Sequence, residues 1–187
     1  PEDDPHRRAY LGVLVDALVR LGNSYRNLER WGPATTSLTR AVGLSHKLTE
    51  QSPGEPYASF ALIWALRSLA VLLEHTDRPA EASSALDAAL RNAEMLAQLA
   101  AGDEELAETA GDGFGITLSE VAALHKRQDR TQEAIDSYER ALEYWELRHE
   151  RHPDHLSATM REDVARSLVL LLFQIGQSDR AEQVMGV

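Results

Sequence analysis

Apolar and small residues recur at helical spacing in four segments of the chain, each directly after a polar or proline-containing turn. After the turn at Asp129-Arg130, the residues Ala134, Tyr138 and Ala141 fall on one helical face at spacings of four and three. The matching residues after the other turns are Ala34, Leu38 and Ala41, then Ala82, Leu86 and Ala89, and finally Ala181. The small residues let a second helix approach closely, and the larger one fills the space beside them. Such a repeat predicts a helical solenoid.

Turn residues divide the chain into eight expected helices. Gly32-Pro33 separates the first two, because proline suits the first turn of a new helix. Glycines 111, 113 and 115 are expected to interrupt the fifth helix, and the chain end truncates the eighth. The expected ranges are about 6–29, 33–52, 56–75, 79–101, 103–127, 131–151, 154–175 and 177 onward.

The aligned alanines give the period of the repeat. Ala34, Ala82, Ala134 and Ala181 are separated by 48, 52 and 47 residues. The first helices follow the same register at Leu21, Leu69, Val121 and Leu168, and at Gly22, Ala70, Ala122 and Val169. We therefore expect an all-α fold, a right-handed α-solenoid of antiparallel helix pairs. It forms a single domain over residues 1–187, with units at about 6–53, 56–101, 103–153 and a partial 154–187.

The pattern resembles the tetratricopeptide repeat (TPR) family. The resemblance lies in Leu18-x2-Leu21-Gly22-x2-Tyr25 followed by Ala34-x3-Leu38-x2-Ala41, and in Ala134-x3-Tyr138-x2-Ala141. The period is longer than the usual unit of about 34 residues, and the added residues lengthen the helices. The chain looks like the long-period variety found in large multidomain proteins of high-G+C bacteria, beside nucleotide-binding regulatory or protease-like modules. The resemblance implies an interaction or sensor segment without activity of its own.

In the TPR family the first helix of each pair lines a concave face, and this implies a candidate ligand-binding set. Its members here are Asp16, Asn23, Arg26, Asn27, Trp64, Arg67, Ser119, Lys126, Asp163 and Arg166. The basic and amide members would donate to a peptide backbone or carboxylate. The alternative is a solvated face whose charges pair with one another, such as Asp16 with Arg67 or Asp163 with Arg166. The carboxylate-clamp form of the family has lysine where Val19 stands, which disfavours that form.

The amino-acid composition argues against several classes of binding partner and site. The net charge of −11 argues against nonspecific binding to nucleic acid or anionic membranes. The absence of cysteine excludes disulfides, thiolate metal sites and cysteine nucleophiles. With no secretory signal and no run of apolar residues long enough for a membrane span, we expect a cytoplasmic location. The chain begins without methionine and is interpreted as a fragment of a longer protein.

Two local motifs have competing interpretations. Gly111-Asp112-Gly113-Phe114-Gly115 is either a hinge or site of close ligand approach, or a break that lets Phe114 reach the core, and we favour the break. His149, His152 and His155 cluster around Pro153, but histidines beside a helix stop are more often surface residues than metal ligands. We expect no metal site, no cofactor and no catalytic residues. Trp64, Tyr138, Tyr144 and Trp145 are expected to serve packing.

The last unit lacks part of its second helix, so Leu168, Leu171 and Leu172 are expected to be incompletely covered. This end would then pack on a neighbouring protein, on further repeats or on a second copy. The leading functional hypothesis is a non-enzymatic scaffold that binds protein or peptide, as one segment of a larger bacterial regulatory protein. The alternative is a small-molecule or peptide sensor that controls a fused effector. An enzyme has little support.

Overall fold

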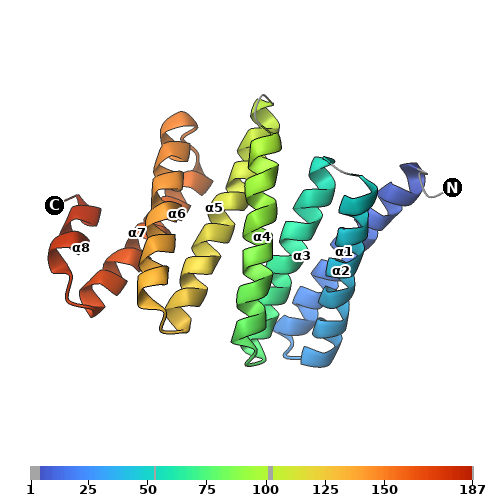
Figure 1. The fold of residues 1–187 in the computed structure, drawn as a ribbon, viewed down its shortest axis with the longest axis horizontal. Coiled ribbons are helices and arrows are strands. Elements are labelled where there is room, and N and C mark those ends of the chain that lie inside the picture. The colour runs from blue at the N-terminus through green and yellow to red at the C-terminus, as the bar shows by residue number, and fades with distance from the viewer. Residues whose placement is uncertain (1–4, 53, 101–102, 187) are drawn as a thin grey trace. The chain divides into compact units, whose positions relative to one another are not determined.

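A computed structural model of the chain describes residues 5–52, 54–100 and 103–186, and all regular secondary structure in these ranges is helical (Figure 1). The eight helices agree with the expected ones to within a few residues. They are α1 (Pro5–Asn27), α2 (Trp31–Gln51), α3 (Pro56–His75), α4 (Pro79–Leu99), α5 (Glu104–Arg127), α6 (Thr131–Arg151), α7 (His155–Gln174) and α8 (Ser178–Met185). The expected unit boundaries at Pro53, Ala101 and Val187 lie outside the described residues.

The chain forms two compact units, Pro1–Phe114 and Gly115–Val187. In the first unit α1 packs on α2, α3 packs on both α1 and α2, and α4 packs on α3. In the second unit α6 packs on α7, and α7 packs on α8. Successive helices reverse direction through short turns (Figure 1). Within the first unit each helix from α1 to α4 thus packs on its chain neighbour, and the first helices of its two pairs, α1 and α3, pack on each other, as in an α-solenoid.

The turns within the helix pairs repeat the register of the sequence. Glu29, Asp77 and Asp129 have φ angles of 56°, 57° and 57°, and Gly176 has 76°. The next residue in each turn donates its N–H to a carbonyl five residues earlier, as from Arg30 to Tyr25 at 2.9 Å. This left-handed residue and its hydrogen bond form the Schellman end of a helix. The same backbone turn therefore closes the first helix of all four pairs.

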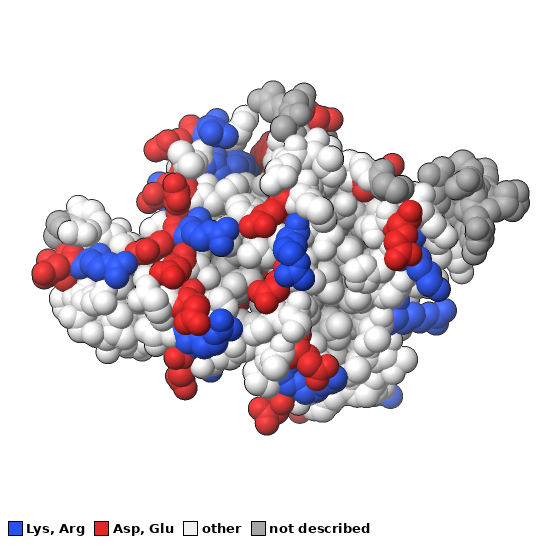
Figure 2. Space-filling model, in the orientation of Figure 1, with Lys and Arg blue, Asp and Glu red and all other residues white. Residues whose placement is uncertain are grey.

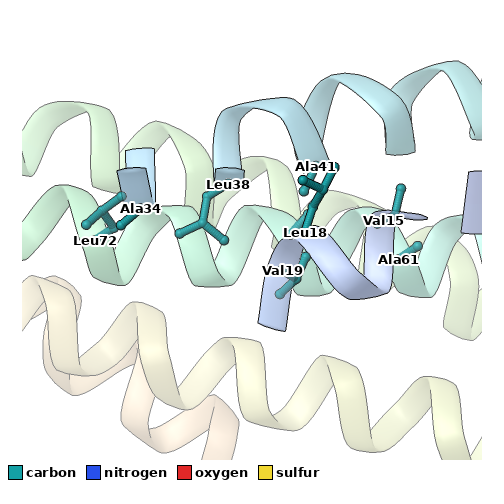
Figure 3. Close-up of a cluster of buried hydrophobic side chains, with 9 residues drawn as sticks. Val15, Leu18, Val19, Ala34, Leu38, Ala41, Ala61 and Leu72 are labelled. Atoms are coloured by element: carbon teal, nitrogen blue, oxygen red, sulfur yellow. The ribbon is translucent and has the colours of Figure 1, made fainter. Parts of the chain in front are cut away.

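The signature alanines are at the centre of the helix pairs. Ala34, Ala82, Ala134 and Ala181 are all 0% exposed, so the four aligned alanines share the same buried environment. In the first unit α1, α2 and α3 bury one cluster, made of Val15, Leu18, Val19, Ala34, Leu38, Ala41, Ala61, Ala65 and Leu72 (Figure 3). Burial of apolar side chains of this kind is the main favourable term in folding.

Gly22 is a point of close approach between α1 and α2. A side-chain carbon added at this position would lie 2.5 Å from Cγ of Leu38, which is itself fully buried. Only glycine therefore lets α1 and α2 approach to this distance.

The expected interruption of the fifth helix is wrong, because α5 runs continuously from Glu104 to Arg127. Phe114 is half-buried without any break in the helix. A side-chain carbon at Gly115 would lie 2.5 Å from Tyr144 and 2.7 Å from Trp145, so this glycine lets α5 pack closely on α6. The boundary between the two compact units falls directly before Gly115. The hinge interpretation stays a prediction.

The expected exposure of the last leucines is also wrong. Leu168 and Leu172 are 0% exposed and Leu171 is 5% exposed, because α6 and α8 both pack on α7. The apolar residues that α7 does expose are different ones, Leu170 and Phe173.

Of the described helices, only α3 is long and apolar enough to cross a membrane by length and composition. Of the residues in its most apolar window, 56% are buried inside the protein, and α3 packs on α1, α2 and α4. Its apolar circumference is therefore that of a helix packed on several sides, as expected from its sequence.

Candidate binding cavity

A partly open cavity of about 220 Å³ lies in the first unit, where α1, α3 and the first part of α5 meet. Its lining is mostly apolar and includes three aromatic side chains. The lining residues are Val15, Asp16, Tyr57, Phe60, Ala61, Ile63, Trp64, Arg67 and Gly113. A mostly apolar recess with a few polar groups is the usual form of a ligand site.

One face of α3 supplies the main wall of the cavity. Tyr57, Phe60, Trp64 and Arg67 are spaced by three, four and three residues, so they follow one another along a single face of the helix. Pro56 occupies the first turn of α3 and starts the helix directly before Tyr57. Tyr57 is 50% exposed and marks the outer end of this wall.

A charged group borders the cavity on the side of α1. Nε of Arg20 donates to Oδ2 of Asp16 at 2.8 Å, and the Arg20 guanidinium lies 5.4 Å from the centre of the Trp64 ring. The hydrogen bond to Asp16, with the attraction of its charge, raises the pKa of Arg20. Arg20 thereby connects a carboxylate on α1 to an aromatic face on α3. The cavity has an apolar interior and a rim that carries both signs of charge.

Three of the ten residues in the predicted binding set line this cavity, namely Asp16, Trp64 and Arg67. Asn23 donates from Nδ2 to Oγ of Ser68 at 3.1 Å and so links α1 to α3, while its Oδ1 is buried without a partner. Arg26 lies near the end of α1, where Nη2 is 3.4 Å from Oδ1 of its neighbour Asn27.

The remaining predicted residues lie in the second unit. Ser119 donates to the carbonyl of Gly115 within α5 at 2.9 Å, and Lys126 lies in the last turn of the same helix. Arg166 contacts Glu162 at 2.6 Å and Asp163 at 3.6 Å, all exposed on α7. The expected charge pair between Asp163 and Arg166 is therefore present.

Tyr57, Phe60 and Ile63 line the cavity but were not among the residues predicted from the sequence. The spacing of Tyr57, Phe60 and Trp64 was visible in the sequence, but α3 is apolar around most of its circumference. The pattern could not show which apolar face is covered by other helices and which is left open. The feature of the sequence that could have indicated this face is the pair of aromatic residues, Phe60 and Tyr57, one and two turns before Trp64.

The histidines near Pro153 form part of a helix end. Nδ1 of His149 lies 2.9 Å from Oγ of Ser157. Among the described residues, no group of three or more histidine, aspartate and glutamate side chains is arranged to hold a metal ion.

The surface charges of the molecule are mixed. On the face in view, basic and acidic side chains are interspersed over the helices (Figure 2). Several are paired at the start of a helix, such as Arg78 with Glu81 at α4 and Arg130 with Glu133 at α6, two pairs at the same register of successive repeats.

A scan against protein-family models found no match, and a search of curated proteins found none. Similar solved structures include the crystal structure of the de novo designed helical repeat protein DHR64, with a TM-score of 0.39 and 18% identity over 100% of both chains. The DHF58 filament has a TM-score of 0.42 and 18% identity, covering 100% of this chain and 87% of that one. The crystal structure of MamA protein has a TM-score of 0.28 and 12% identity, covering 94% and 90%.

At these identities and TM-scores, the fold class follows from the chain's own helices. Four helix pairs in one sequence register, four equivalent Schellman turns and four buried alanines define an α-helical repeat protein in the residues that the structure describes.

Proposed function

We propose that the chain is a long-period member of the TPR family and binds a protein or peptide segment through the cavity on α1 and α3. The function is that of a non-enzymatic, cytoplasmic scaffold within a larger bacterial regulatory protein. The observation that carries the proposal is the mostly apolar recess of about 220 Å³, with Asp16 and Arg67 in its lining.

The size of the recess favours a peptide over a whole small molecule. Pockets that enclose a drug-sized ligand have volumes of roughly 300–1,000 Å³. A recess of about 220 Å³ instead fits one bulky apolar side chain, an anchor residue in a longer chain. This favours the scaffold over the alternative, a sensor for a small molecule. A peptide sensor would use the same contacts.

The polar groups suit the backbone beside such an anchor. Arg67, on α3, offers guanidinium donors to a carbonyl, and Asp16, on α1, offers a carboxylate to an N–H. Val19, at the position of the clamp lysine, is buried in the core. The proposed ligand is therefore an internal peptide segment with a leucine, methionine or phenylalanine anchor, and its terminal carboxylate is not required.

An array of short peptides tests this function. Each peptide carries leucine, methionine, phenylalanine, glycine or aspartate at one central position within otherwise random sequence. The chain should retain peptides with an apolar centre, and the Trp64→Ala variant should bind the strongest of them at least about tenfold more weakly in fluorescence polarisation.

Matched variants act as controls. Trp31→Ala removes a tryptophan that stacks on His75 outside the cavity, and Arg40→Ala removes an exposed arginine of α2. Both should bind the peptide as the unchanged chain does, whereas Arg67→Ala should bind it more weakly. Equal binding by Trp64→Ala, Arg67→Ala and the controls would refute the cavity as the binding site.

A further inference from the structure

Gly113 has no packing explanation within the described part of the chain. It lies in the interior of α5, where glycine is less favourable than alanine because its backbone loses the most conformational freedom on folding. A side-chain carbon added at Gly113 would meet no neighbouring helix or side chain of the described residues within 4 Å. At Gly115, only two residues further, the same carbon would lie 2.5 Å from Tyr144. Close helix packing therefore requires the glycine at 115 but not the one at 113.

The repeat itself does not require glycine at this position either. In the register of the four helix pairs, Gly113 corresponds to residues that all carry side chains, namely Val13, Ala61 and Met160. Ala61 is 7% exposed, so this register position accommodates a methyl group even where the helix is buried. The glycine is therefore specific to α5 and is not part of the repeat pattern.

Gly113 does border the candidate binding cavity. It is the residue that α5 contributes to the lining, whereas α3 contributes the aromatic side chains Tyr57, Phe60 and Trp64. Its missing side chain leaves open space at the cavity that these aromatic residues line. A residue that lowers helix stability and at the same time enlarges a recess indicates a role in what the recess binds.

We propose that Gly113 determines the size of the anchor residue and that the preferred anchor is phenylalanine. The inference rests on the proposed function, peptide binding in this cavity, and adds the residue that sets its specificity. A phenylalanine ring gains the most from three aromatic lining residues, because aromatic pairs attract one another beyond the area that they bury. It is also the bulkiest of the proposed anchors, and the absent side chain at Gly113 provides the space for it. A smaller anchor such as valine does not depend on that space.

Three versions of one peptide test this specificity. They are the strongest peptide from the array with phenylalanine, leucine or valine at its central position, and fluorescence polarisation measures their binding. The unchanged chain should bind the phenylalanine version most tightly and the valine version least. Gly113→Ala should bind the phenylalanine version at least about fivefold more weakly, because the added methyl group overpacks the occupied recess, and the valine version about equally.

The melting temperature separates this role from a structural one. Gly113→Ala should raise it, since alanine favours helix and meets no clash in the free chain. Stability and binding of the phenylalanine version then change in opposite directions, which general damage to the fold cannot produce.

Gly43→Ala is the matched control. Gly43 is an exposed glycine inside α2, away from the cavity lining, and an added side-chain carbon there also meets none of the described residues within 4 Å. This variant should raise the melting temperature and bind all three versions as the unchanged chain does.

The outcomes distinguish the inference from the function on which it rests. Trp64-dependent binding in which Gly113→Ala weakens all three versions alike, or none of them, would overturn the role of Gly113 and leave peptide binding standing. Tightest binding of the leucine or valine version by the unchanged chain, or a lowered melting temperature for Gly113→Ala, would overturn it as well. An array without any Trp64-dependent peptide would overturn both the inference and the proposed function.

Discussion

Single small residues determine how closely these helices pack. Gly115 faces Tyr144 and Trp145, and Trp145 is fully buried and cannot move aside. Gly43, by contrast, is exposed in the middle of α2, where an added side-chain carbon meets nothing within 4 Å. We therefore expect replacement by alanine to have opposite effects on stability at these two positions, although both glycines lie inside helices. Their sequence context alone does not distinguish them.

Gly115→Ala should lower the free energy of unfolding by about 1–3 kcal/mol, because the added methyl group overpacks the contact between α5 and α6. Gly43→Ala should raise it by about 0.5–1 kcal/mol, since alanine restricts the unfolded chain and favours helix. Urea denaturation followed by circular dichroism measures both. Equal effects of the two substitutions would contradict the close approach at Gly115.

Among individual residues, three of those that line the cavity belong to the binding set predicted from the sequence. Trp64, Arg67 and Asp16 were identified by carrying TPR lining positions across, and all three line the recess. Tyr57 and Phe60 were missed because the open side of an apolar helix depends on how its neighbours are placed. The break at the glycines was wrong for a related reason, since a glycine can serve close packing and leave the helix intact.

The start of α7 is fixed by hydrogen bonds to the side chain of its capping residue. Asp154 caps α7, where its Oδ1 accepts the Ser157 N–H at 2.7 Å and its Oδ2 accepts from Nη2 of Arg148 at 2.9 Å. The Ser157 backbone and side-chain hydrogen bonds, followed by Arg148, lower the pKa of Asp154 to about 2. The carboxylate form of Asp154 therefore stabilises the folded state.

This cap should make stability depend on pH. A folded-state pKa below the unfolded value of 3.8 gives a contribution that is complete above about pH 4 and is lost as the pH falls through about 2. Asp154→Ala should lower the melting temperature at neutral pH, and its difference from the unchanged chain should shrink towards about pH 2. Asp87→Ala, an exposed position within α4, is the control. A difference that stays constant over this range would contradict the role of the carboxylate.

Element positions were largely predictable, because turn residues and helical periodicity agree along the chain. The exposure of Leu168, Leu171 and Leu172 was mispredicted at this scale. The short α8 was judged too incomplete to cover them, but α6 of the preceding helix pair also packs on α7 and completes their burial.

For the whole molecule, the repeat with a period near fifty residues is the central structural result. The registers of 48, 52 and 47 residues hold for the alanines, for the Schellman turns and for the starts of the second helices at Trp31, Pro79, Thr131 and Ser178. The right-handed superhelix and the single domain stay predictions. The ligand could not be read from the sequence, because a repeat pattern determines packing and leaves the open face unconstrained.

An NMR titration of the isotope-labelled chain with the strongest peptide from the array tests most directly whether the cavity binds a peptide. The three tryptophan indole N–H signals report separately on Trp31, Trp64 and Trp145. We expect saturable shifts of the Trp64 indole and of the Asp16, Arg67 and Gly113 amides, while the signals of Trp31 and the fully buried Trp145 stay unchanged. Saturable shifts centred on α2 or α4, with Trp64 unmoved, would contradict peptide binding in the cavity.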